Sequence, residues 1–251
     1  MNRKIPSRVL KILLVLFTPL ALLVSTLSFG GESTLTDDAL KNEIFKNILE
    51  RSFPYQAAIW FGPNATSREI AVCWESLDTS SPNDRDAVAK AVHDSWEINS
   101  KVRFRGWKKC APNNRGVRIV VEDVAPDAGP HTTGLGNQID GLPNGMSLDF
   151  RFANFSSAFC SAPDKRDHCI KAISVHEFGH ALGFAHEQNR DDTPDWCKST
   201  ELAQGPNGDT IVTPWDSKSV MNYCYNMYTA ADFQLSKLDI YTLQLYYGKP
   251  D

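Results

Sequence analysis

Residues 176–186 read H-E-F-G-H-A-L-G-F-A-H, and this spacing constrains the local fold more than any other feature of the chain. Two histidines four residues apart on a helix project from one face and can place two imidazole nitrogens on one metal ion. Gly183 can adopt left-handed backbone, which ends the helix and returns His186 to the same ion. We therefore predict one Zn²⁺ ion held by His176, His180 and His186, with a fourth coordination position open to water.

Glu177 lies between the first two histidines and is expected to face the open side of the metal. Zinc lowers the pKa of a bound water from about 15.7 towards 7, and a neighbouring carboxylate can take its proton and later give it to a leaving amine. With ordinary residue frequencies, the whole motif arises by accident in about one chain of this length in a hundred thousand. An ordinary helix with surface histidines is thus a poor alternative. We expect a hydrolytic reaction by zinc-activated water, with Glu177 as the general base.

These residues resemble a known family. H-E-x-x-H-x-x-G-x-x-H is typical of the metzincin metallopeptidases, and Glu187 with the nearby Arg190 is similar to the sequence that follows the third histidine in astacins. Residues 219–223, S-V-M-N-Y, resemble the astacin Met-turn, S-x-M-x-Y, although Asn222 stands where astacins usually carry histidine. The resemblance extends over roughly residues 65–250. A matrixin-like metzincin is the alternative within the same chemistry.

The resemblance implies an α+β fold. In that fold a twisted mixed β-sheet and two long helices lie above an irregular C-terminal subdomain with a final helix, and the zinc cleft lies between them. Tyr223 is implied as a ligand of the resting metal and as a donor to the oxyanion, with a tyrosine that only packs as the alternative. Met221 is implied as an apolar floor beneath the zinc. Glu187 is implied to bond the mature N-terminus, and a salt bridge to Arg190 is equally open.

The first 30 residues have the pattern of a secretory signal peptide. Four basic residues precede an apolar run at 12–27, and small residues follow it. The run is shorter than the ~20 residues of a membrane span and contains Pro19, so we expect cleavage rather than a retained anchor. The predicted location is extracellular, or periplasmic in a bacterium, with no stable membrane association after cleavage.

Beyond the leader, residues 31–64 would form a short pro-segment or an N-terminal strap, and residues 65–251 the astacin-like catalytic domain. Removing the four basic residues of the leader from the 26 Lys and Arg leaves 22 against 30 Asp and Glu, a net charge of −8. Nucleic acid is disfavoured as a partner, because phosphate backbones require a clustered positive surface. We expect a monomer that acts on protein or peptide substrates. A secreted zinc-binding adhesin or pseudoprotease is the alternative, which the intact Glu177 disfavours.

Six cysteines follow the leader, and an even number in an exported chain indicates disulfides. Fifteen pairings are conceivable. We favour Cys73 with Cys110, Cys160 with Cys169, and Cys197 with Cys224. No C-x-x-C occurs in the sequence, so a structural zinc site made of cysteines is not expected.

A continuous apolar run predicts a strand at 70–74, and alternating apolar residues predict strands at 102–105, 117–121 and 146–152. Ser81 and Asp84 mark the start of a helix after the first strand, and Ser236 and Asp239 mark the start of a final helix. A strand, a helix and a second strand in this order predict parallel pairing through a right-handed crossover.

Residues 125–145 are rich in Gly, Pro, Asn and Asp and are predicted to be a long surface loop. By the family resemblance, the strand at 146–152 would be the antiparallel edge to which an extended substrate adds by main-chain hydrogen bonds. Residues 140–150 would then line the cleft. A strand that only packs on the core is the alternative.

Further metal ions are not expected. His131 and His168 are isolated histidines without a partner at ligand spacing, so a second zinc ion is a minor alternative. Asp127, Asp140 and Asp149 could offer oxygen ligands, but their spacing matches no recognised calcium loop. Calcium is therefore also a minor alternative.

Overall fold

The computed structural model describes residues 53–62, 65–125, 129–154, 158–224 and 233–251. These residues belong to one unit, Lys41–Asp251. The predicted signal peptide and the first part of the predicted pro-segment lie outside the described residues, as does Asp127.

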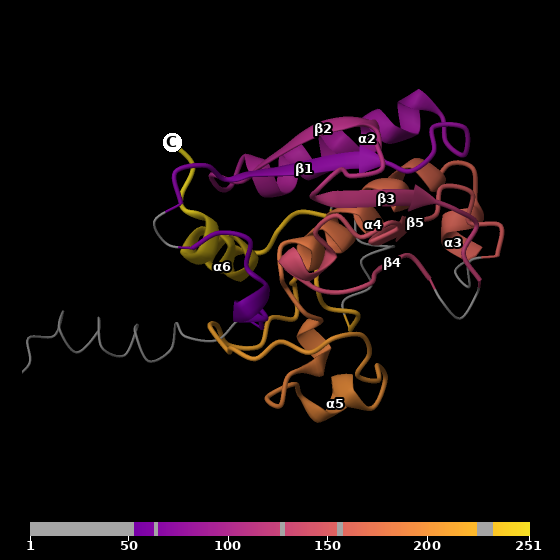
Figure 1. The fold of residues 1–251 in the computed structure, drawn as a ribbon. Helices are drawn as coiled ribbons and strands as arrows, with labels where there is room; N and C mark the ends of the chain where they lie inside the picture. Colours follow the sequence, from indigo (N-terminus) through magenta and orange to yellow (C-terminus); the bar gives the residue numbers. More distant parts are fainter. Residues whose placement is uncertain (1–52, 63–64, 126–128, 155–157, 225–232) are drawn as a thin grey trace, which may run out of the picture. The chain divides into compact units, whose positions relative to one another are not determined.

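One five-stranded sheet organises the upper part of the described structure, in the order β2-β1-β3-β5-β4 (Figure 1). The strands are β1 (Glu69–Trp74), β2 (Arg103–Lys109), β3 (Val117–Val121), β4 (His131–Thr132) and β5 (Met146–Leu148). β1 pairs in parallel with both β2 and β3, β3 pairs in parallel with β5, and β4 is antiparallel to β5. The predicted mixed sheet and the parallel pairing of the first strands are confirmed.

The predicted antiparallel edge is wrong. β5 is shorter than the predicted strand at 146–152, runs parallel to β3 and lies inside the sheet, whereas β4 is the antiparallel edge. The reason is a reversal within the predicted surface loop. There η3 (Gly136–Ile139) and the turn after it send the chain back beside β4 in the opposite direction. Leu135 and Ile139 are fully buried, so this part of the loop packs on the core.

The first long helix, α2 (Pro82–Val92), starts at the predicted cap and continues into one π-helical segment, η2 (His93–Glu97). Ser81 Oγ accepts a hydrogen bond from the Asp84 N–H at 3.1 Å, which satisfies one of the free N–H groups at the helix start. Trp96 is fully buried, and its indole Nε1 donates to the Val175 carbonyl of α4 at 2.9 Å.

The second long helix, α4 (Arg166–Ala181), packs against α2 and also against the sheet. Phe178 lies on its sheet side. Its ring centroid is 4.8 Å from that of Phe104 and 5.6 Å from that of Trp107, both on β2. α4 packs against both α2 and the sheet. Its C-terminal turn is therefore well supported and can position side chains precisely.

The remaining elements are short, apart from the final helix. They are η1 (Gln56–Ala58), α3 (Ala158–Ser161), η4 (Glu187–Asn189), α5 (Asp195–Lys198) and α6 (Lys237–Tyr247). α6 begins with the predicted capping box of Ser236 and Asp239 and ends at Gly248, which has a φ of 81°. Within the described residues, no helix has the length and apolar character needed to cross a membrane.

The three predicted disulfides are confirmed: Cys73–Cys110, Cys160–Cys169 and Cys197–Cys224. The third joins α5 to the residue that follows the Met-turn, which we define as residues 219–223.

Residues 53–62, which we call the strap, run along the chain that follows α4. The Ala185 N–H donates to the Phe53 carbonyl at 3.1 Å, and the Tyr55 N–H donates to the Gly183 carbonyl at 2.9 Å. The Pro54 carbonyl accepts from the backbone N–H of Asp209 at 3.0 Å. The strap therefore joins the end of α4 to the loop before the Met-turn.

Candidate metal centre

The C-terminal turn of α4 carries the first two histidines of the motif, and the turn that follows carries the third. His176 and His180 lie one helical turn apart, and the helix ends directly after them. Gly183 has a φ of 94°, the left-handed backbone expected of this residue, and its N–H donates to the His180 carbonyl at 2.8 Å. The chain therefore turns back, and all three histidines are buried at one place.

The three Nε2 atoms converge. His186 Nε2 lies 3.1 Å from His176 Nε2 and 3.0 Å from His180 Nε2. A tetrahedral ion bound at 2.0–2.1 Å would hold its nitrogen ligands about 3.3 Å apart, close to these separations. Within the described part of the chain, these histidines form the single group of three or more side chains placed to share a metal. His131 and His168 are not part of such a group.

Main-chain carbonyls determine which nitrogen of each histidine is free. Each Nδ1 lies 2.7–2.8 Å from a carbonyl oxygen: His176 at Val220, His180 at Phe184 and His186 at Gln204. A carbonyl only accepts, so each Nδ1 carries the proton and each Nε2 presents a lone pair. Three lone pairs at about 3 Å repel one another unless a cation lies among them. The residues therefore fit Zn²⁺, which neutral imidazoles bind through a free nitrogen.

Burial keeps the histidines in this neutral form. It lowers the pKa of His176 to about 3, with repulsion from His186 as a second cause. Burial also lowers the pKa of His180 and of His186. Because metal ligands must be unprotonated, the folded chain presents the ligand form of all three side chains at neutral pH.

Glu177 has the environment of a group that exchanges protons near neutrality. Its side chain is buried, and its Oε2 has no hydrogen-bond partner among the described residues. Burial raises the pKa of Glu177 to about 8. A nearby divalent cation favours the ionised carboxylate and acts in the opposite direction.

The Met-turn lies against α4. Met221 is buried, and a Cβ placed on Gly179 would come within 2.3 Å of its Sδ, so the thioether fills the space that this glycine leaves. The Tyr223 ring centroid lies 5.2 Å from that of His176 and 4.6 Å from that of His186. Met221 therefore packs on the helix that carries His176 and His180, and Tyr223 lies beside two of the histidines, while the predicted floor beneath the metal stays a prediction.

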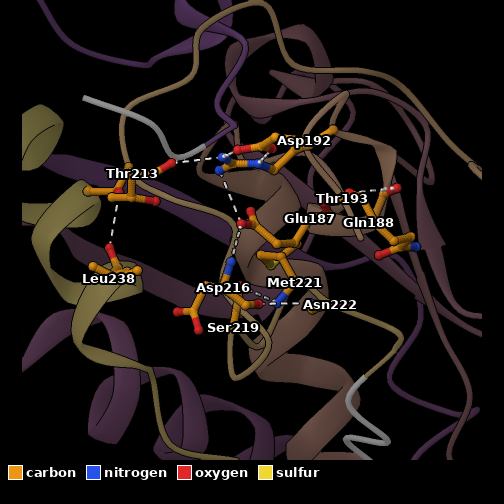
Figure 2. Close-up of polar contacts among 12 residues, drawn as sticks. Glu187, Gln188, Asp192, Thr193, Thr213, Asp216, Ser219, Met221, Asn222 and Leu238 are labelled. Atoms are coloured by element: carbon orange, nitrogen blue, oxygen red, sulfur yellow. Dashed lines mark hydrogen bonds and ion pairs between the residues drawn. The ribbon is translucent and has the colours of Figure 1, made fainter. Parts of the chain in front are cut away.

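Figure 2 shows Ser219, Met221 and Asn222 beside Glu187 and Asp216. The Glu187 N–H donates to the Met221 carbonyl at 2.9 Å, and Glu187 Oε1 accepts from the Asp216 N–H at 2.8 Å. Glu187 thereby joins the start of η4 to the chain at residues 216–221.

The Glu187 carboxylate also forms an ion pair with Arg190. Glu187 Oε1 lies 3.1 Å from Arg190 Nη1, and the Arg190 side chain is fully buried. This ion pair is the alternative that the sequence left open for Glu187. The bond predicted by family resemblance, to a mature N-terminus, stays a prediction.

Two residues of this region were missed by sequence reasoning. Gln188 Oε1 accepts from the Tyr223 N–H at 3.2 Å. Asn222 is fully buried; its Nδ2 donates to the Asp216 carbonyl at 2.7 Å, and its Oδ1 accepts from the Cys224 N–H at 3.0 Å. The departure from the astacin histidine at 222 was the one signal available, and it indicates a structural amide.

Comparison with known proteins agrees with the geometry. A sequence profile of the peptidase family Astacin matches residues 165–238, which include α4, the three histidines and the Met-turn. The fold is similar to a solved structure of myroilysin, with a TM-score of 0.52 and 18% identity over 80% of this chain and 100% of that chain. A crystal structure of myroilysin aligns at 19% identity over 79% of this chain and 89% of that chain, with a TM-score of 0.46. No curated protein matches the chain.

Proposed function

The chain belongs to the astacin family of zinc metalloendopeptidases, and from that premise we propose that it is an exported protease in which Glu177 is the general base and Tyr223 assists. The observation that carries this proposal is the convergence of three Nε2 lone pairs at the end of α4, the helix that also carries Glu177, whose buried Oε2 has no hydrogen-bond partner among the described residues. A bound zinc ion supplies Lewis acidity and lowers the pKa of a coordinated water.

Glu177 moves the proton in this proposal. Its Oε2 takes a proton from the attacking water and returns it to the nitrogen of the leaving amine. Burial, which raises the pKa of Glu177 to about 8, favours proton uptake, and the nearby cation favours release. These opposing effects support a pKa near the working pH, where a group can serve as both base and acid.

Tyr223 is assigned two roles, as a ligand of the resting metal and as a donor to the oxyanion during hydrolysis. The support is its ring, which lies beside His176 and His186. A phenolic O–H in that position stabilises the negative charge that develops on the carbonyl oxygen.

Export and maturation follow from the N-terminal segments and the cysteines. Three disulfides support a location outside the reducing cytoplasm, as expected after cleavage of residues 1–30. Because the strap is bonded to the turn that carries His186, we place the maturation cut before Phe53 and assign the strap to the active enzyme. We infer that this enzyme is a monomer.

The substrate is a protein or peptide. In this proposal it adds in extended form to the outer edge of β4 rather than to β5, since β4 lies beyond β5 at one end of the sheet among the described residues.

Cleavage of casein and of a quenched peptide by the purified enzyme tests the proposal. We expect cleavage that stops with a zinc chelator and returns when zinc is added. Glu177→Gln removes the base while keeping the size of the side chain, so it is expected to retain zinc and to lose about 10²- to 10⁴-fold in kcat. Wild-type protein that binds one zinc ion but cleaves neither substrate would overturn the proposal.

A further inference from the structure

We propose that Asp239, the carboxylate of the α6 capping box, is a positioning residue for the zinc ligand His176 and holds its ring through Val220. The inference concerns the metal site of the proposed enzyme, but it does not depend on which peptides are cleaved.

Asp239 joins the start of α6 to the Met-turn. Its Oδ1 accepts from the Ser219 hydroxyl at 2.7 Å, and its Oδ2 accepts from the Val220 N–H at 3.1 Å. The same Oδ2 accepts from the Ser236 N–H at 3.0 Å, which is its bond within the capping box. Two of these three donors lie outside the helix that the residue caps, so the carboxylate does more than a helix cap requires.

Val220 links Asp239 to the zinc ligand His176 through its own backbone. While its N–H donates to Asp239, its carbonyl oxygen accepts from His176 Nδ1 at 2.7 Å. A hydrogen bond to the second ring nitrogen orients a histidine ligand and fixes its tautomer. Moving Val220 therefore turns the imidazole and changes where His176 Nε2 points.

The C-terminal end of α6 is hydrogen-bonded to the end of α4. The buried Tyr247 hydroxyl donates to the carbonyl of Leu182, at the C-cap of α4, at 2.7 Å. Gln244 Nε2 donates to the Asn99 carbonyl at 3.0 Å, beyond the end of η2. These contacts do not involve Asp239, so α6 is expected to stay docked when the carboxylate is changed.

His180 and His186 provide an internal comparison. The carbonyls that hold their Nδ1 atoms belong to Phe184 and Gln204, and neither residue bonds to Asp239. A positioning role thus predicts an effect on one ligand of the three, whereas a general loosening of the fold would affect all of them.

Asp239→Asn is the variant that tests this. The amide is nearly the same size as the carboxylate, but it is neutral, so its oxygen accepts from the Val220 N–H more weakly than a carboxylate oxygen does, and its NH₂ group replaces the acceptor that faces the Ser219 hydroxyl. Asp84→Asn is the matched control. Asp84 also occupies the third position of a capped helix, and its carboxylate accepts from Arg166 at 2.8 and 2.9 Å, at the N-terminal end of α4, the end away from the histidines.

The zinc dissociation constant is measured by competition with a chromophoric chelator, alongside thermal unfolding of the metal-free proteins. We expect Asp239→Asn to raise the dissociation constant about tenfold, the lower end of the range for residues that orient metal ligands. Asp84→Asn is expected to leave zinc binding within twofold of wild type. Equal dissociation constants for the two variants would overturn the proposal.

The Nδ1–H resonances of ¹⁵N-histidine-labelled, zinc-loaded protein give the second readout. Asp239→Asn is expected to shift the His176 resonance and to leave those of His180 and His186 in place. Should that variant not fold, Ser219→Ala tests the link between Asp239 and the Met-turn from the other side, since it removes the donor to Asp239 Oδ1 and leaves the Val220 N–H in place. A shift of all three resonances, or of none, in the folded variant would contradict the proposal. Because neither readout uses peptide cleavage, a failed protease assay and a failed positioning role remain distinguishable.

Discussion

The three zinc ligands share one chemistry but are held by different parts of the chain. His180 is oriented by Phe184, four residues further on, whereas His176 depends on the Met-turn and His186 depends on Gln204. The His180 contact forms within the turn that ends α4. The contacts of His176 and His186 require the later chain to fold back onto α4. Single residues far from the motif therefore influence the metal site.

Replacing Tyr223 with phenylalanine tests its proposed role at this scale. The ring contacts with His176 and His186 are apolar and should survive, but the hydroxyl is lost. Removing one donor to an oxyanion typically costs about 10²- to 10³-fold in kcat, so we expect a loss near the lower value with little change in KM. Steady-state kinetics with a quenched peptide measure both constants, and a kcat within twofold of wild type would refute the donor role.

The ionisation of the site predicts how the stability of the metal-free protein depends on pH. Burial lowers the pKa of His176 to about 3, whereas an unfolded histidine titrates near 6.5. Below about pH 6.5 the unfolded chain binds protons that the folded chain does not, so the free energy of unfolding falls on acidification towards about pH 3.

Glu177 acts in the opposite direction. Burial raises the pKa of Glu177 to about 8 from 4.5, so between these values the folded chain binds the extra proton. Acidification from pH 8 to pH 4.5 then raises the free energy of unfolding through this group. Metal-free Glu177→Gln lacks this compensation and should lose stability more steeply than wild type between pH 6.5 and 4.5. Urea unfolding at several pH values provides the measurement, and parallel curves for the two proteins would argue against the raised pKa.

At the scale of elements, patterns that act over a few residues were predictable and the assembly of strands was not. The capping residues of α2 and α6 and the left-handed Gly183 depend on local hydrogen bonds and backbone sterics, and all three were predicted. The sheet edge was predicted wrongly, because β4 is two residues long and its pairing depends on the reversal at η3.

The same distinction applies to the metal site. The histidines and Glu177 share one short motif, so their proximity follows from helix geometry together with the left-handed turn at Gly183. The hydrogen bonds of Gln188 with Tyr223 and of Asp239 with Val220 join residues that are 35 and 19 positions apart. Such contacts depend on how η4 and α6 pack, which no periodicity in the sequence reveals.

Gly179 provides a test of packing between α4 and the Met-turn. A methyl group there would lie 2.3 Å from Met221 Sδ and 3.1 Å from the Trp96 ring, so Gly179→Ala is expected to cost about 1–3 kcal/mol of stability by overpacking. Gly62→Ala is the matched control, since a Cβ at Gly62 meets no atom within 4 Å, and its expected effect is within about 0.5 kcal/mol. Denaturant unfolding of the zinc-free proteins compares them. Equal stability of the two variants would show that the Met221 thioether can move away at little cost.

At the scale of the whole molecule, the disulfides differ in what they constrain. Cys160–Cys169 closes a separation of 9 residues and Cys197–Cys224 one of 27, so chain entropy alone predicts stabilisation of about 2.6 and 3.5 kcal/mol. The Cys197–Cys224 bridge also fixes Cys224, the residue next to Tyr223.

Removing each bridge by paired alanine substitutions separates stability from activity. We expect the variant without Cys160–Cys169 to unfold at lower denaturant concentration but to keep its kcat at 20 °C. The variant without Cys197–Cys224 should lose both stability and kcat, because Tyr223 is no longer held on its C-terminal side. An unchanged kcat in the second variant would show that Gln188 and Asn222 are sufficient to hold the tyrosine.

The hydrogen-bond acceptors that orient the three imidazoles are peptide carbonyls, and every amino acid supplies one. Mutation can exchange the side chains of Val220, Phe184 and Gln204 without deleting these acceptors, provided that the path of the backbone is kept. A centre supported in this way is expected to accept changes of side chain at these three positions with little effect on where the imidazoles point.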